Sequence, residues 1–240
     1  MTSAPETPAP APRRNPLARI AGLVTDPAGT MREVAERPDW LVPLLIILVI
    51  SVTLNVIAVP RVDFEIDMRE QLAKSNLSEQ EVEEAVERVA AFQKIAAPVT
   101  AASVVIILLA LSALYLLLSR IFGGEGTFRQ FFAVTCYAWM VQLVKSILAI
   151  ILLIRAGTVT ADQVGALLKS NLAFLADPSD QPMLYAVLSS IDLFNFAALA
   201  LMVLGFGHAS RLGKERFAAI VIASYVLWIL VKVGFASLRA

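Results

Sequence analysis

Five long apolar runs, separated by polar segments, dominate the pattern of this chain. They cover residues 40–59, 96–119, 130–154, 182–207 and 217–237. A helix needs roughly 20 predominantly apolar residues to cross a hydrocarbon core about 30 Å thick, and each run has this length. Membrane β-strands would instead show segments of about ten residues with alternating polarity, a pattern that the chain lacks. The runs predict an all-α membrane protein whose domain, residues 40–238, is a bundle of five transmembrane helices.

The segment before the first run begins polar and then becomes amphipathic. Residues 1–14 are rich in proline and lack an apolar stretch, which predicts a disordered cytosolic tail and not a signal peptide. Asn15 and Asp26 each precede a proline, and this pattern starts a helix. The two helices each have one apolar side, formed by Leu17, Ile20 and Val24 in the first and by Met31, Val34 and Ala35 in the second. We expect residues 15–39 to form amphipathic helices in the membrane interface, with a small packed soluble unit as the alternative.

The connection between the first two runs, residues 60–95, is long enough to have structure of its own. Apolar residues recur at helical spacing in two groups, which are Phe64, Met68 and Leu72, then Val82, Val86 and Val89. Ser78 and Glu81 form a capping-box pattern at the start of the second group. The segment predicts a helical extracytoplasmic insertion with nine acidic and five basic residues. We interpret it as a solvated cap over the bundle, with a dedicated binding surface as the alternative.

The distribution of basic residues predicts the orientation of the chain. The short connections 120–129 and 208–216 hold 5 lysines and arginines in 19 positions, whereas the connections 60–95 and 155–181 hold 7 in 63. Basic residues are enriched in cytoplasmic loops, so the N-terminus is expected in the cytosol. Five spans then place the C-terminus on the extracytoplasmic side. The composition, rich in alanine and arginine, suits a bacterial inner membrane.

Overall composition excludes some classes of partner and site. Hydrophobic residues make up 58% of the chain and charged residues 17%, which is unlike a soluble domain. The 20 basic and 20 acidic residues balance, so a nucleic-acid partner is not expected. Cys136 is the single cysteine and lies in the third run, so no intrachain disulfide is possible.

Three apolar runs contain one charged residue each, namely Lys145, Asp192 and Lys232. Lys145 is ten residues from Arg155, and Asp192 is ten residues from Pro182, both at the outer ends of their runs. At about 1.5 Å per residue, both side chains lie roughly 15 Å deep, near the middle of the bilayer. Lys232 is close to the end of its run, so we expect it to extend to the headgroups without forming a site.

The matching depths of Lys145 and Asp192 predict an ion pair. A single unpaired charge in the middle of a span costs roughly 2.5 to 3.5 kcal/mol, and pairing lowers this cost for both groups. Other polar residues at helical spacing extend the pair into a layer between the third and fourth spans. The predicted intramembrane layer, structural or relay in role, consists of Gln142, Lys145, Ser189, Asp192 and Asn195, with Ser146 nearby.

Several local stretches and their order resemble a known family. The stretches are "ERPDWLVPLLI" before and in the first run, "IFGGEGTFRQFF" between the second and third, and "SSIDLFNFAALALMVLGFGHASRLGKERFAAIVI" from the fourth into the fifth. In these features the chain is similar to the bacterial branch of the Yip family, multi-pass membrane proteins whose eukaryotic members are Ypt/Rab-interacting proteins. The similarity extends over residues 16–232.

The resemblance implies a five-helix membrane domain with a cytosolic N-terminus and no catalytic site. Two features of trafficking members are missing here. The Asp-Leu and Gly-Pro pattern near the first span is not found, and no proline follows Tyr137 in the third run. These departures argue against a small GTPase as partner.

Two classes of function compete for the polar layer. In the first, the layer holds the helices in register, and the protein is a membrane scaffold or organising factor that contacts lipid and other membrane proteins or copies of itself. In the second, Asp192 and Lys145 form part of a proton or small-ion path in a transporter or channel. Transporters favour inverted repeats and glycine- or proline-broken spans, which are not evident here, so we favour the scaffold.

No pattern predicts an enzyme, a metal site or a cofactor. His208 is the single histidine, and the chain contains no HExxH motif, no paired cysteines and no phosphate-binding glycine loop. The "GGEG" at residues 123–126 joins two spans and not a strand to a helix. We therefore expect a non-enzymatic protein without catalytic, cofactor-binding or metal-binding residues.

Overall fold

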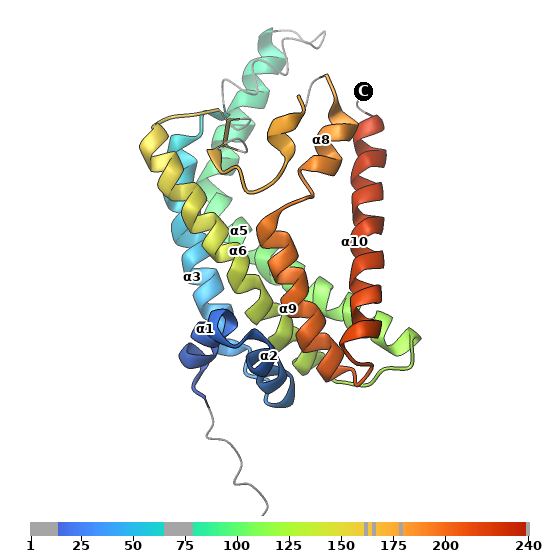
Figure 1. The fold of residues 1–240 in the computed structure, drawn as a ribbon. Helices are drawn as coiled ribbons and strands as arrows, with labels where there is room; N and C mark the ends of the chain where they lie inside the picture. The colour runs from blue at the N-terminus through green and yellow to red at the C-terminus, as the bar shows by residue number, and fades with distance from the viewer. Residues whose placement is uncertain (1–13, 65–78, 161–162, 165–166, 178–179, 239–240) are drawn as a thin grey trace, which may run out of the picture.

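The computed structural model describes residues 14–64, 79–160, 163–164, 167–177 and 180–238. Over these residues the chain is helical, without strands, and its elements follow in a simple order (Figure 1). They are α1 (Pro16–Thr25), α2 (Pro27–Glu36), α3 (Leu41–Ala58), the 3-10 turn η1 (Val59–Arg61), α5 (Glu79–Ile121), α6 (Phe128–Ala156), the 3-10 turn η2 (Ala173–Leu175), α8 (Pro182–Leu188), α9 (Leu193–Ala209) and α10 (Lys214–Ser237). The predicted tail, residues 1–14, lies outside the described residues except for Arg14.

The bundle is organised around α6 and α9, which pack against each other in its centre (Figure 1). Helices α3 and α5 contact α6, while α10 contacts α9. Aromatic rings pack in the same buried cluster as the apolar side of α2, and the rings of Phe131 and Phe206 stack with their centroids 4.8 Å apart. Tyr115 and Phe217 pack against the same pair. This cluster joins α5, α6, α9 and α10.

Among the described residues, four helices are long and apolar enough to cross a membrane, and they coincide with four of the five predicted runs. They span Leu41–Arg61, Ile95–Ile121, Phe128–Ala156 and Lys214–Ser237. The prediction of one continuous helix over residues 182–207 is wrong, because the chain turns between α8 and α9. Helix α9 is apolar but has 17 residues, which gives a length of about 25 Å.

Polar side chains cause this break by replacing the backbone bonds of a helix. The hydroxyls of Ser189 and Ser190 donate back to the carbonyl of Ala186 at 3.1 and 2.9 Å. The Asp192 carboxylate then accepts from the first backbone N–H groups of α9 as its N-cap. Serine and aspartate compete in this way with helical hydrogen bonds, so α8 ends after seven residues and a new helix, α9, begins at Leu193.

The insertion predicted over residues 60–95 is not a separate helical unit in its second half. Residues from Glu79 onward belong to α5, a single helix of 43 residues that continues through Pro98 into the predicted second span. Val86 of the second apolar group is buried within it. The predicted positions Met68, Leu72 and Ser78 lie outside the described residues.

Both predicted N-terminal helices form, with the predicted capping residues. The Asn15 side chain accepts from the Ala18 N–H at 2.7 Å, and Asp26 accepts from the Gly29 N–H at 3.0 Å. Asp26 also pairs with Arg14 at 3.0 Å. The hydrogen bonds from Arg14 and from the Gly29 N–H hold the pKa of the Asp26 carboxyl below its usual range. The α1–α2 corner is therefore stabilised by a carboxylate that stays ionised under mildly acidic conditions.

The apolar side of α2 packs on protein and not on lipid. Met31, Val34 and Ala35 are fully buried, because α2 lies against α6 and α9. On α1, by contrast, Leu17 and Val24 are largely exposed. The predicted contact with the membrane interface therefore remains a prediction for α1, whereas the predicted apolar face of α2 belongs to the protein core.

A fully buried arginine connects the N-terminal helices to the bundle. The guanidinium of Arg19 in α1 donates to Asp39 at 2.6 Å and to Glu33 of α2 at 3.0 Å. It also donates to the carbonyl of Arg37 at 2.9 Å, and Tyr137 of α6 donates to the same Asp39 at 3.1 Å. A buried charge requires such partners, so this network determines where α1 and α2 dock.

Replacing Arg19 should undock the N-terminal helices. We expect Arg19→Gln to lower the free energy of unfolding by about 2–4 kcal/mol, because Glu33 and Asp39 lose their ion pairs with a fully buried guanidinium. The exposed Arg32→Gln on α2 removes the same charge without breaking the network and is the control. Denaturation in detergent micelles measures both variants. Equal stability of the two would contradict the role given to Arg19.

Candidate functional site

The break between α8 and α9 buries the Asp192 carboxylate and surrounds it with hydrogen-bond donors. Its side chain is fully buried. One oxygen accepts from the Lys145 ammonium at 2.8 Å and from the Ser170 hydroxyl at 2.6 Å. The other oxygen accepts from the backbone N–H groups of Phe194 and Asn195 at 2.9 and 3.0 Å. A carboxylate offers about four lone-pair sites, so these four donors saturate it.

Helix α6 supplies the side chains that face this carboxylate. Lys145 is 30% exposed and forms the ion pair with Asp192. One turn away, the Gln142 amide donates to the Asn195 side chain at 2.9 Å. The hydroxyl of Ser146 turns back to the carbonyl of Gln142. The structure thus brings four of the five predicted layer residues into two contacts between α6 and the start of α9.

Ser189 is the predicted layer residue that does not join these contacts. We expected it on one helical face with Asp192 and Asn195, but residues 189–192 are not helical, so the i, i+3 spacing does not apply. For the same reason the predicted depth of Asp192, counted along a continuous helix, does not hold. Ser189 instead accepts a hydrogen bond from Lys232 at 3.0 Å.

The prediction that Lys232 of α10 extends to the headgroups without forming a site is wrong. Its ammonium donates to Ser189 and, at 2.8 Å, to Ser190. One face of α10 also carries Tyr225, whose hydroxyl donates to the Ser190 carbonyl and accepts from the Asn195 amide at 3.4 Å. Among the described ion pairs, none joins Lys232 to a carboxylate. The seven-residue spacing of Tyr225 and Lys232, two helical turns, is the signal that sequence reasoning overlooked.

The connection between α6 and α8 folds over the break and satisfies its backbone. The N–H of Leu193 donates to the Ser170 carbonyl at 3.1 Å, and the N–H of Leu172 donates to the Leu188 carbonyl at 3.2 Å. Asn171 and Asp192 form an isolated antiparallel bridge. A helix interrupted in apolar surroundings leaves such groups unpaired, so this contact is what the break requires. The sequence marked the segment only as an outer loop.

Over the described residues, the contacts of the site join α6 to α9 and leave no free lone-pair position on the Asp192 carboxylate. Both Asp192 oxygens are occupied, and the described residues contain no group of three or more His, Cys, Asp or Glu side chains suited to a metal. Cys136 is buried in the α3–α5–α6 core. His208 lies at the opposite end of α9, where its ring contacts Glu36 at 3.0 Å.

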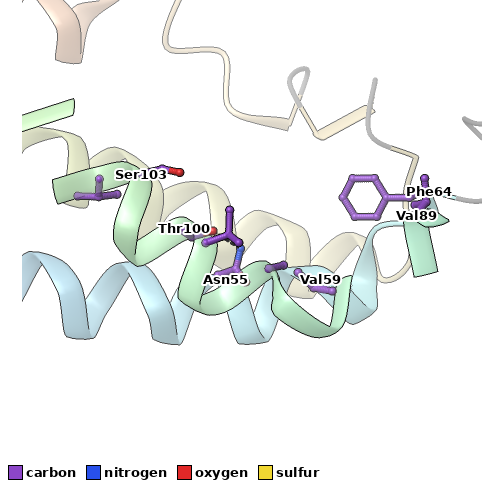
Figure 2. A pocket seen from close by; sticks show the side chains of 9 residues that line it. Asn55, Val59, Phe64, Val89, Thr100 and Ser103 are labelled. Atoms are coloured by element: carbon purple, nitrogen blue, oxygen red, sulfur yellow. Dashed lines mark hydrogen bonds between the residues drawn. The ribbon is translucent and has the colours of Figure 1, made fainter. Parts of the chain in front are cut away.

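A separate cavity of about 310 Å³ lies between α3 and α5 (Figure 2). Its lining is apolar except for a few polar side chains, and none of the nine lining residues is ionisable. Figure 2 shows Asn55 of α3 beside Thr100 of α5, and the Asn55 amide donates to the Thr100 hydroxyl at 3.0 Å. This cavity resembles lipid-facing packing space more than a site for chemistry.

Comparison with protein families gives the identity of the domain. Residues 21–237 match the Yip1 domain. The chain belongs to the Yip1 domain family. Together with its four long apolar helices, this membership identifies the chain as an integral membrane protein. No curated protein and no solved structure matches it at a significant level.

The Yip1 match includes every helix from α2 to α10 and therefore both ends of the bundle. The polar site at the α8–α9 break and the glycine-containing connection between α5 and α6 both fall within it. The family assignment confirms the resemblance seen in the sequence.

A double-mutant cycle should detect the Lys145–Asp192 contact. We expect Asp192→Ala to cost about 3–5 kcal/mol of unfolding free energy, because it removes the helix cap and leaves buried donors unpaired. Lys145→Met should cost less, since three donors to Asp192 remain. The two changes should be coupled by about 1–3 kcal/mol, measured by denaturation in detergent micelles. Strictly additive effects would contradict an energetically important pair.

Proposed function

We propose that this Yip1-domain protein is a non-enzymatic membrane scaffold that organises other membrane proteins or copies of itself. The observation that supports this most is the saturation of Asp192 by four donors. A relay needs a carboxylate with a free position for a proton, water or ion. Here every position is used to hold α6, α9 and the 170–172 segment together, which suits a structural role.

The outer surface supports an assembly role. Helix α10 exposes a continuous apolar face to its surroundings, which includes Val226, Leu227, Trp228, Leu230 and Phe235. In a bilayer such a face contacts lipid tails or the helices of another protein, and either contact leaves the polar site undisturbed. A rigid bundle with apolar outer faces fits a protein whose function is to contact others.

We propose the following topology in the membrane. The four long helices and the shorter α9, with α8 completing its path, give five crossings of a bacterial inner membrane. The enrichment of arginine and lysine in the α5–α6 and α9–α10 connections favours a cytosolic position for that end and for the N-terminus. The C-terminus is then extracytoplasmic.

A proton or small-ion path is the second candidate, and one observation favours it. Polar side chains form a chain across three helices, from Gln142 of α6 through Asn195 of α9 and Tyr225 of α10 to the Ser190 carbonyl beside Lys232. Two of its links are carboxamides, which neither gain nor lose a proton near neutral pH. The chain is therefore better suited to fixing helix positions than to transferring protons.

Flux measurements separate the two candidates. We expect proteoliposomes loaded with a pH-sensitive dye to show the same proton leak as empty liposomes, for wild type and for Asp192→Asn alike. The exposed Asp180→Asn, outside the site, is the control for a general change in charge. Proton flux that Asp192→Asn abolishes and Asp180→Asn preserves would replace the scaffold by the relay.

Site-specific photo-crosslinking in the native membrane tests the scaffold directly. A photoreactive residue at Leu227 of α10, which is exposed, should yield discrete protein adducts of reproducible mass. The same residue at Val49 of α3 probes the opposite apolar face, and Phe217 in the core is the buried control. If Leu227 and Val49 yield adducts with lipid alone, the scaffold proposal fails.

A further inference from the structure

The α5–α6 and α9–α10 connections lie at the end of the bundle that carries α1 and α2 (Figure 1). Residues of both connections line a polar pocket of about 410 Å³. It is far along the chain from the Asp192 site and shares no residue with it. Its polar lining consists of Arg120, Glu125, Thr127, Gln130 and Arg211. Most of these residues belong to the "IFGGEGTFRQFF" stretch, which the proposed function leaves unexplained.

The two connections are locked together by their backbones. The Glu125 N–H donates to the Ser210 carbonyl at 2.8 Å. Gly126 has a φ of +102°, and a Cβ at this position would lie 2.8 Å from the Ala209 carbonyl oxygen, so only glycine fits. Arg211 has a φ of +58°, an uncommon conformation for a residue with a side chain. The walls of the pocket are therefore held in place before any ligand arrives.

Arg120 at the end of α5 and Arg211 in the α9–α10 connection line this pocket, and both have donors to spare. Arg120 donates to the Gly126 carbonyl at 2.6 Å, and Arg211 pairs with Glu125 at 2.9 Å. A guanidinium has five N–H donors in a planar fork, so most donors of both remain available. This fork matches the oxygens of a phosphate group, so the two guanidinium groups that line the pocket suit a phosphate anion.

The start of α6 adds to the same field. Thr127 caps this 29-residue helix, and Gln130 completes the capping box. The positive end of the helix dipole therefore points into the pocket beside the arginines, which favours an anion there. With two positive side chains and one carboxylate, Glu125, the lining has an excess of positive charge.

Exposed apolar side chains next to the pocket indicate where the anion comes from. Ile121, Phe122 and Phe128 are 65%, 60% and 40% exposed, and they lie at or just beyond the end of α5 and at the start of α6. Such side chains belong at a membrane interface, beside the headgroups. We propose that the pocket binds the phosphate group of an anionic phospholipid in the leaflet at this end of the bundle.

Glu125 regulates access to this site. In the structure its carboxylate pairs with one nitrogen of Arg211 and places a negative charge in the lining, which opposes the binding of a phosphate. Removing the charge should therefore strengthen lipid binding. This inference is independent of the scaffold proposal, because it concerns other residues and another end of the bundle.

Lipid retention by the full-length protein tests the inference. The probe is phosphatidic acid added to the protein in neutral detergent, and native mass spectrometry measures the bound fraction. We expect Arg120→Gln and Arg211→Gln to weaken binding by about tenfold each, as the loss of a charged hydrogen bond requires. Glu125→Gln should bind more tightly than wild type. Arg129→Gln, which removes an equal charge from an exposed residue outside the lining, should bind like wild type.

Several results would overturn the inference. If Arg129→Gln weakens binding as much as Arg120→Gln, the attraction is a general surface charge and not a pocket. If phosphatidylcholine binds as well as phosphatidic acid, the phosphate is not recognised by charge. If inorganic phosphate alone displaces the lipid at equal concentration, a soluble phosphate and not a lipid is the ligand. Arg120→Lys retains the positive charge but not the planar guanidinium fork. Thermal unfolding without lipid identifies any variant that is misfolded.

Discussion

Within apolar surroundings every polar group needs a partner, and the carboxylate of Asp192 is the place where this constraint acts most strongly. Because it caps α9, it breaks the fourth apolar run. Because it is charged and buried, it needs Lys145 from α6. Because the break exposes backbone groups, the 170–172 segment folds over it. All three features originate from Asp192, and together they join α6, α8, α9 and the connection between α6 and α8.

Sequence reasoning was most successful where one local pattern decides the outcome. Apolar runs predicted the long helices, and the caps Asn15 and Asp26 predicted both N-terminal helices. The pairing of Lys145 with Asp192 was expected because a charge within an apolar run needs a partner, although the depth of Asp192 counted along a continuous helix does not hold. The break at residues 189–192 was not predicted, because average hydropathy hides four residues within a long apolar run. Lys232 was misjudged for the same reason, since its partners exist only where the helix stops.

Helix α6 links the two buried charge networks of the bundle. Tyr137 reaches Asp39 in the network around Arg19, and Lys145 reaches Asp192. The two positions on α6 are eight residues apart, or about 12 Å along the helix. The N-terminal helices and the α8–α9 break are thus both held in position by contacts with the same helix, α6. A shift of α6 would disturb both networks. The two networks therefore favour one arrangement of the helices around α6.

The position of α9 along its own axis is restrained at both ends, and this has a bearing on function. At its start, Asp192 holds the cap. Toward its end, a Cβ on Gly205 would lie 2.6 Å from the Val134 side chain, and a Cβ on Gly207 would lie 2.9 Å from the Lys214 backbone. Sliding α9 past α6 would therefore unmake a saturated carboxylate at one end and force close contacts at the other. Transport by alternating access needs packed helices with two discrete arrangements of similar energy. A central helix restrained in this way favours one arrangement, as a scaffold requires.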